Sequence, residues 1–152
     1  MNDHYWMKQA LIQARLAELK DEVPIGAVVV KNNELIGFGH NKVISTSDPT
    51  AHAEIVALRH AAKQINNYRL VNCTLYVTIE PCLMCFGSLI HSRISKVIFG
   101  ALEPKAGVFK SNLKAASLGF INHKIDYDHG ILEHDCKTII QNFFKQKRLK
   151  KH

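Results

Sequence analysis

The 152-residue chain alternates short, strand-like apolar runs with amphipathic helical segments, and this alternation limits the fold more than any other feature. Strands that alternate with helices form layered α/β sheets. Residues 25–30 and 35–39 are separated by Asn32-Asn33, a pair that tolerates positive φ, so they predict a β-hairpin. Because a hairpin is antiparallel, we expect a mixed rather than an all-parallel sheet.

The other elements follow from hydrophobic spacing and from helix-start signals. Helices are predicted over residues 4–20, 51–64, 81–91 and 131–150, with a short one near 112–118, and strands over 74–78, 96–101 and 124–127. We expect Thr50 or Asp48 to cap the second helix, and Pro81 to open the third, since proline suits the first helical position. The whole chain, 1–152, is predicted to form one domain with a basic C-terminal helix from about residue 131.

Composition excludes several classes of protein. Hydrophobic residues make up 47% of the chain and charged residues 22%, which is enough for a core and argues against disorder. No apolar run approaches about 18 residues, so we expect no transmembrane helix. The N-terminal residues lack the basic and apolar blocks of a signal peptide. The expectation is a cytoplasmic protein without a membrane partner.

The net charge of +7 (20 basic minus 13 acidic residues) is concentrated near the C-terminus. Residues 143–152 hold five Lys or Arg residues and no acid. Cations at the end of a helix can simply be a solvated surface that suits the helix dipole. They can also contact a polyanion, and the adjacent Phe143-Phe144 favours nucleic acid because aromatic rings stack on unpaired bases.

Two motifs carry the residue types of a metal site. His52-Ala53-Glu54 lies in the opening turn of the second predicted helix, and Cys82 and Cys85 lie in the opening turn of the third. Both helices follow a strand, so their first turns can meet at the carboxyl edge of the sheet, where ligands bind in α/β folds. One imidazole and two thiolates form a ligand set suited to zinc.

The number of ligands indicates what such a metal would do. Structural zinc sites use four protein ligands, whereas three leave one position for water, whose pKa bound zinc lowers to roughly 7. Glu54 can approach the same site as a general base only if His52 lies in a loop-like first turn, because positions i and i+2 of a regular helix diverge. Two readings without catalysis by zinc stay open: a redox dithiol of Cys82 and Cys85, and a structural zinc with an unidentified fourth ligand.

The two motifs together resemble the H-x-E…P-C-x-x-C signature of zinc-dependent nucleobase deaminases. A longer pattern, covering nearly the whole chain, resembles the bacterial tRNA-specific adenosine deaminases of the cytidine and deoxycytidylate deaminase superfamily. It is carried by residues 5–7, 23–28, 41, 48–55, 67–70, 74–85, 91–94, 130–132 and 143–144. The resemblance implies a cytidine deaminase-like α/β fold, with three layers, α-β-α, around a five-stranded mixed sheet.

The resemblance also implies hydrolytic deamination of adenosine to inosine at the wobble position of a tRNA anticodon. His52, Cys82 and Cys85 would hold one zinc ion per subunit, and Glu54 would move protons between water, base and departing ammonia. Asn41 matches the base-contacting asparagine of the family. The family works as a homodimer that binds the anticodon stem-loop near the subunit boundary.

Further RNA contacts are expected from the segment after the fourth strand and from the last helix. They are Glu103, Lys105, Phe143, Phe144, Lys147 and Arg148. Glu103 stands where the family usually has Asp, which leaves the preference for flanking bases open. Phe86 is bulkier than the usual small residue and is expected to repack the core or the dimer contact.

Two other functions remain compatible with these residues. A deaminase of a free base or nucleotide, such as guanine or cytosine, would use the same zinc chemistry but needs no basic C-terminal helix. A non-catalytic, zinc-stabilised RNA-binding module would use the helix but has no need of the carboxylate of Glu54.

Overall fold

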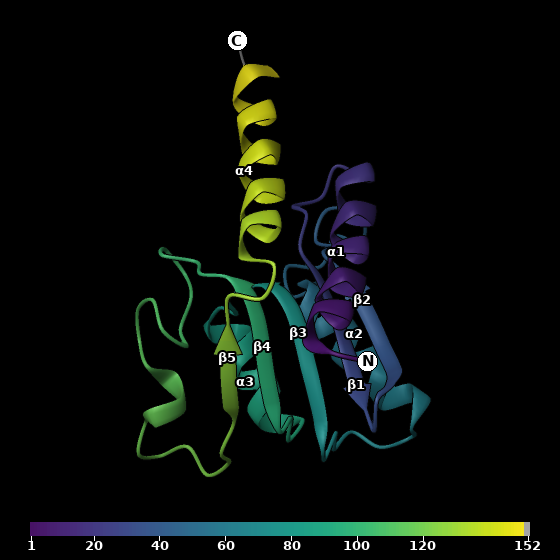
Figure 1. Cartoon of the computed structure of the whole chain (residues 1–152), viewed down its shortest axis with the longest axis vertical. Helices are drawn as coiled ribbons and strands as arrows, with labels where there is room; N and C mark the ends of the chain where they lie inside the picture. The colour runs from purple at the N-terminus through teal and green to yellow at the C-terminus, as the bar shows by residue number, and fades with distance from the viewer. Residues whose placement is uncertain (151–152) are drawn as a thin grey trace.

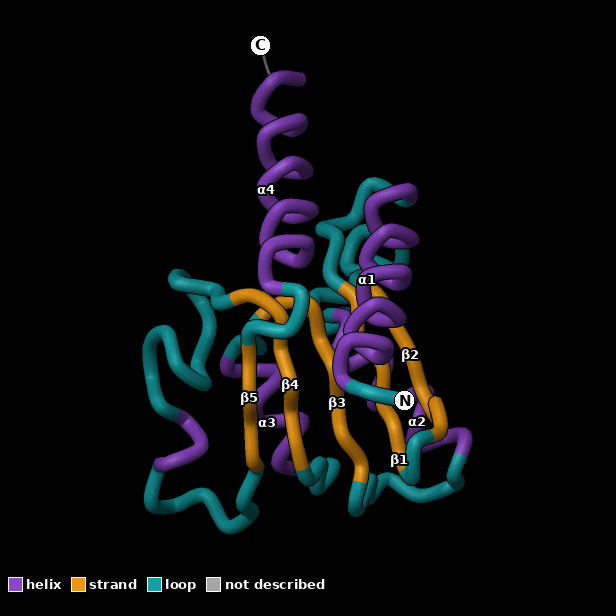
Figure 2. The backbone as a smooth tube through the Cα atoms, viewed as in Figure 1, coloured by secondary structure: helices purple, strands orange, loops and turns teal. Residues whose placement is uncertain are grey.

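The computed structural model describes residues 1–150 and has a sheet with helices on both faces (Figures 1 and 2). Lys151, part of the basic tail, lies outside the described residues. The elements are α1 (Asp3–Leu19), β1 (Gly26–Lys31), β2 (Glu34–His40), α2 (Ala53–Gln64), β3 (Cys73–Ile79), α3 (Leu83–His91), β4 (Lys96–Ala101), a 3-10 turn (Ala115–Ser117), β5 (Asp126–His129) and α4 (Glu133–Lys150).

The sheet is five-stranded and mixed, as predicted, with the order β2-β1-β3-β4-β5. Strand β1 is antiparallel to both β2 and β3, while β3, β4 and β5 are parallel. Strands β2, β3 and β4 therefore run in the same direction. Their carboxyl ends share one edge of the sheet, from which the chain leads into α2, α3 and the long segment before β5.

Two apolar layers sandwich the sheet and confirm the three-layer α-β-α architecture. In β1, Ala27 and Val29 belong to the cluster that contains the buried residues of α2 and α3. Val28 and Val30 belong to the cluster with α1 and α4. This alternation follows from the two-residue period of a strand, which sends successive side chains to opposite faces. Figure 1 shows α1 and α4 on the near face and α2 and α3 behind the sheet.

The predicted cap of α2 is wrong. The N-cap residue is His52, with extended backbone angles (φ −70°, ψ 155°) and no capping bond from its own side chain. Asp48 instead accepts hydrogen bonds from the backbone and hydroxyl of Thr50, so it closes the preceding turn. The first amide of the helix, that of Ala53, donates to Asn41 across the sheet edge, and a distant residue thereby replaces a local cap.

The predicted start of α3 is also wrong by two residues. Cys82 is the N-cap, again extended (φ −81°, ψ 177°), and the helix begins at Leu83. Pro81 lies outside the helix, and its carbonyl accepts a hydrogen bond from Val108. The partner on another segment keeps Pro81 in the loop, although its ring would fit the first helical turn.

Helix α4 begins at Glu133 and runs beyond the edge of the sheet (Figure 1). Its buried residues are Cys136, Ile139 and Phe143, so burial is confined to its first three turns. The last turns carry Lys147, Arg148 and Lys150. Among residues 1–150, no helix is both long enough and apolar enough to cross a membrane.

Candidate metal and substrate site

The fold brings the two predicted motifs together. His52 caps α2 after the chain leaves β2, and Cys82 caps α3 after the chain leaves β3. Cys85 lies in the first turn of α3 and is fully buried. Because β2 and β3 end at the same edge, the two caps converge there.

The ligand atoms of these residues have the spacing of a metal site. His52 Nδ1 lies 3.7 Å from Cys82 Sγ and 3.5 Å from Cys85 Sγ. A tetrahedral zinc with ordinary Zn–N and Zn–S bonds places nitrogen and sulfur about 3.6 Å apart. The donor set therefore fits zinc. Among residues 1–150, no other His, Cys, Asp or Glu side chain joins this group.

The surroundings of Cys82 favour the thiolate form that binds metals, whereas the hydrogen bond to Cys82 and burial raise the pKa of the Cys85 thiol. Interactions with Cys85 and then with His52 together lower the pKa of the Cys82 thiol to about 4, against the effect of burial. Both sulfurs also lie at the start of α3, where the helix dipole favours negative charge. A dithiol alone would share these features, but His52 facing both sulfurs favours metal binding over redox chemistry.

Glu54 lies beside the three ligands without joining them. It is the second residue of α2 and its side chain is only 3% exposed. Burial and the charge of Cys82 together raise the pKa of its carboxyl to about 7. The extended backbone of His52 provides the loop-like first turn that the convergence of the two side chains requires.

Asn41 follows β2 and is 7% exposed. Its Oδ1 accepts a hydrogen bond from the backbone N–H of Ala53, at 2.8 Å, between the metal-ligand candidate His52 and Glu54. The amide nitrogen of Asn41 has no hydrogen-bond partner in residues 1–150, which leaves it as a donor. The residue thus combines the cap of α2 with a free polar group at the site.

The predicted RNA contacts largely gather in one hollow. It lies between the segment after β4 and helix α4, and is lined by Glu103, Pro104, Lys105, Ile140, Phe144, Lys147 and Arg148. Phe144 is 43% exposed, whereas Phe143 is 8% exposed and packs edge-on against Phe144. A buried ring offers no face for stacking, so Phe144 is the accessible aromatic of the pair.

Lys147 has an acidic neighbour that the sequence did not suggest. Its ammonium forms an ion pair with Asp21, at the turn after α1, and lies 5.4 Å from the centre of the Phe143 ring. This ion pair lowers the pKa of Asp21 and joins α4 to the N-terminal half of the chain. Any phosphate at this point competes with Asp21 for Lys147.

Two buried carboxylates outside the metal-ligand group were not predicted. Glu80, next to Pro81, and Glu22, after α1, are 2% and 1% exposed. Each accepts backbone N–H groups from a loop that follows a strand. An acidic residue at the end of an apolar strand is the signal that could have revealed Glu80.

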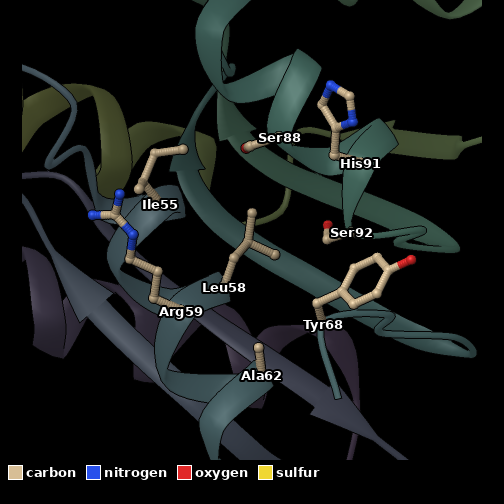
Figure 3. A pocket seen from close by; sticks show the side chains of 8 residues that line it. All are labelled: Ile55, Leu58, Arg59, Ala62, Tyr68, Ser88, His91 and Ser92. Atoms are coloured by element: carbon tan, nitrogen blue, oxygen red, sulfur yellow. The ribbon is translucent and has the colours of Figure 1, made fainter.

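A second hollow, between α2 and α3, lies on the outer surface of that helical layer (Figure 3). Ile55, Leu58 and Ala62 of α2 form one wall, and Ser88 and His91 of α3 form the other. None of the three metal-ligand candidates lines it.

Comparison with known proteins agrees with this geometry. A family model of MafB19-like deaminases matches residues 1–148. A tRNA-specific adenosine deaminase of Buchnera aphidicola subsp. Baizongia pistaciae is 48% identical over 150 residues, covering 97% of this chain and 91% of that protein.

Solved structures place the chain in the same group. One, from a study of A-to-I editing by tRNA:A34 deaminases at the wobble position, has a TM-score of 0.86 at 38% identity, covering 89% of this chain and 98% of that one. A guanine deaminase from Bacillus subtilis has a TM-score of 0.65 at 39% identity, covering 67% and 66%. The chain therefore belongs to the MafB19-like deaminases and, among them, to the family of tRNA-specific adenosine deaminases.

Proposed function

We propose that this protein is a zinc-dependent enzyme that hydrolyses adenosine to inosine at the wobble position of a tRNA anticodon. One observation carries the proposal: His52 Nδ1 faces both cysteine sulfurs at 3.5 and 3.7 Å, with the buried carboxyl of Glu54 beside them. Three ligands and an adjacent acid are what water activation requires. The relatives named tRNA-specific adenosine deaminase and the tRNA:A34 deaminase structure support the choice of adenosine in tRNA.

In this proposal His52, Cys82 and Cys85 hold one zinc ion per subunit. Zinc bound there lowers the pKa of water and so supplies a nucleophile at neutral pH. Glu54 takes one proton from the attacking water and delivers it to N1 of adenine. It then takes the second proton from the oxygen added at C6 and delivers it to the amino group, so that the C6–N bond breaks, ammonia leaves and the carbonyl of inosine forms. Burial raises the pKa of Glu54 to about 7, so its carboxyl can both accept and return a proton near neutrality.

Asn41 orients the base in this scheme. Its Oδ1 is occupied by the amide of Ala53, which fixes the side chain, and its Nδ2 remains to donate to an acceptor on the purine. The base must leave its stack to reach the zinc site, and an unpaired anticodon loop makes this inexpensive.

The hollow beside α4 is proposed to hold the anticodon stem-loop. Phe144 offers a ring for stacking, while Lys105, Lys147 and Arg148 offer cations for phosphates. Glu103 is proposed to contact a base beside the target. This surface favours tRNA over a free base, which has no phosphates to bind.

A homodimer is part of the proposal, with the face shown in Figure 3 as its contact. The hollow between α2 and α3 is lined mainly by carbon, and Tyr68 at its rim is 65% exposed. Burial of such a surface by a second copy removes apolar area from water. Sedimentation velocity is expected to show a dimer for the wild type and a monomer for Tyr68→Glu; a monomeric wild type would contradict this part. We further propose that the whole chain, 1–152, is one deaminase domain that works in the cytoplasm.

Incubation with tRNA tests the function directly. Purified protein with stoichiometric zinc is mixed with total tRNA from cells that lack the modification, and the RNA is sequenced for adenosines that read as guanosine. Conversion confined to a wobble adenosine is the expected result. Release of ammonia from free guanine or cytosine, without change in tRNA, would support the rival free-base deaminase instead.

A further inference from the structure

Glu80 holds an entire loop through one buried carboxylate. Its Oε2 accepts hydrogen bonds from the backbone N–H groups of Phe109, Lys110 and Ser111, at 3.0, 2.8 and 3.0 Å. Its Oε1 accepts the N–H of Glu103, at 3.0 Å, and the hydroxyl of Ser111. Both ends of the segment 103–111 thus bond to the same side chain.

This arrangement requires an ionised carboxylate. Each of the four N–H groups and the hydroxyl needs an acceptor. An amide in place of the carboxylate would turn one edge into a donor that faces donors.

The loop is shaped to approach this carboxylate closely. A Cβ added at Gly107 would lie 2.2 Å from Glu80 Cδ and 2.3 Å from Oε1, so only glycine fits there. Val108 donates to the carbonyl of Pro81, at 3.1 Å, and Phe109 packs edge-on against Phe86 of α3. Phe86 is buried in the core beneath this loop. Segment 103–111 is thus hydrogen-bonded to Glu80 and Pro81, the two residues that directly precede Cys82.

We infer that Glu80 is a positioning residue that fixes Glu103 and Lys105 against α4, and thereby determines which nucleotides beside the target adenosine are accepted. The loop carries both residues into the hollow that Phe144 and Arg148 line from the other side. This inference rests on the proposed function and adds to it. The zinc site performs the chemistry, and the carboxylate of Glu80 positions the loop that forms one side of the neighbouring hollow. Glu80 bonds the segment 103–111 and therefore acts on the hollow through Glu103 and Lys105.

Two variants test the positioning role of Glu80, one on each side of its contact with the loop. Glu80→Gln replaces one of the two acceptor oxygens with a donor, and Gly107→Ala pushes the loop away without altering a residue next to Cys82. Gly119→Ala is the matched control, because it also adds one methyl group between β4 and β5 but has no atom within 4 Å of the new Cβ. All are first assayed for zinc content and folding.

The readout is the deamination of anticodon stem-loops that differ only in the bases beside the adenosine. For Glu80→Gln and Gly107→Ala we expect KM for the preferred stem-loop to rise about ten-fold, because loss of a hydrogen bond to a charged group weakens binding by about this factor. We expect kcat to stay within about three-fold of the wild-type value. The preference among flanking bases should shrink, and amides 109–111 should exchange hydrogen faster. Gly119→Ala should match the wild type.

The failures of the two proposals are distinguishable. If the wild type does not deaminate any stem-loop, the proposed function is wrong. If the wild type is active and both variants keep its KM and its flanking-base preference, or lose kcat alone, then Glu80 has only a structural role and the inference is overturned.

Discussion

Asn41 Oδ1 lies 2.8 Å from the backbone nitrogen of Ala53, and this one hydrogen bond ties the end of β2 to the first turn of α2. The capped turn holds His52 on one side and Glu54 on the other. The position of the proposed base contact is thus coupled to the positions of a metal ligand and of the proton carrier.

The two roles of Asn41 can be separated by substitution. Asn41→Ala removes the acceptor and is expected to lower the free energy of unfolding by about 1 kcal/mol, the usual value of a helix cap, and to abolish deamination. Asn41→Asp keeps an acceptor, and the helix N-terminus favours its charge, so stability should be retained while the donor to the base is lost. Urea unfolding and tRNA deamination measure both. Full activity of Asn41→Asp would show that the side chain only caps the helix.

Replacement of Glu54 should affect turnover alone. Glu54→Gln keeps the shape of the buried side chain but cannot accept or return a proton, so we expect the single-turnover rate to fall by about 10²–10⁴-fold. Zinc content and the Kd for tRNA should stay near those of the wild type. A non-catalytic RNA-binding module predicts instead that this variant is unchanged in every assay.

The ion pair between Asp21 and Lys147 is expected to restrain RNA binding. Asp21→Asn releases the ammonium for a phosphate, and one added contact to a single strand should steepen the dependence of log K on log salt by about 0.7. Binding of an anticodon stem-loop at several salt concentrations gives the slope. A slope unchanged from the wild type would mean that Lys147 stays away from the RNA.

Removal of the metal should cost both activity and stability. A ligand that binds only the folded state stabilises it, by about 2.7 kcal/mol at a concentration of 100 times Kd, because unfolding must release it. Prolonged dialysis against a chelator is therefore expected to lower Tm and stop deamination, and added zinc should restore both. Cys82→Ser serves as a variant with a damaged ligand set. Persistent activity after verified zinc loss would remove the basis of the mechanism.

Glu22 is expected to make stability sensitive to acid. Burial would raise the pKa of this carboxyl, but hydrogen bonds from the backbone N–H groups of Ser45 and Ile44, at 2.7 and 3.0 Å, lower it below its ordinary value of 4.5. A carboxyl with a lowered folded pKa stabilises the protein fully above the unfolded pKa, and this contribution is lost as pH falls from about 5 through the folded pKa.

The corresponding variant is Glu22→Gln. At pH 7 it should be less stable than the wild type by about 2 kcal/mol, and the difference should shrink at pH 4, because Glu22 of the unfolded wild type, with its ordinary pKa of 4.5, is then largely protonated. Urea unfolding of both proteins at each pH gives the difference. Acid release of zinc affects both alike and cancels. A difference that grows toward low pH would contradict the assignment.

Much of the fold could be predicted from local sequence because period and turn signals act locally. Strand 96–101 was predicted with its observed bounds, and α1 and α4 within one or two residues. Strand 124–127 was predicted two residues too early, since it spans Asp126–His129. Two helix starts failed because a distant partner replaced a local one. Asn41 took the capping role expected of Thr50 or Asp48, and Val108 held Pro81 outside α3.

The candidate site likewise has features that local sequence predicts and features that depend on distant partners. By itself the sequence determined the chemistry: one imidazole, two thiols and a carboxylate at the starts of two helices, and a cluster of cations at the C-terminus. Only the tertiary structure decided which groups meet, because the order of the strands sets which carboxyl ends are neighbours. It placed Phe143 in the interior, paired Lys147 with Asp21, and gave Glu80 five hydrogen bonds from one loop. Residue type and spacing limit the reactions available to a chain, but burial and long-range hydrogen bonds depend on the packing of segments that are far apart along it.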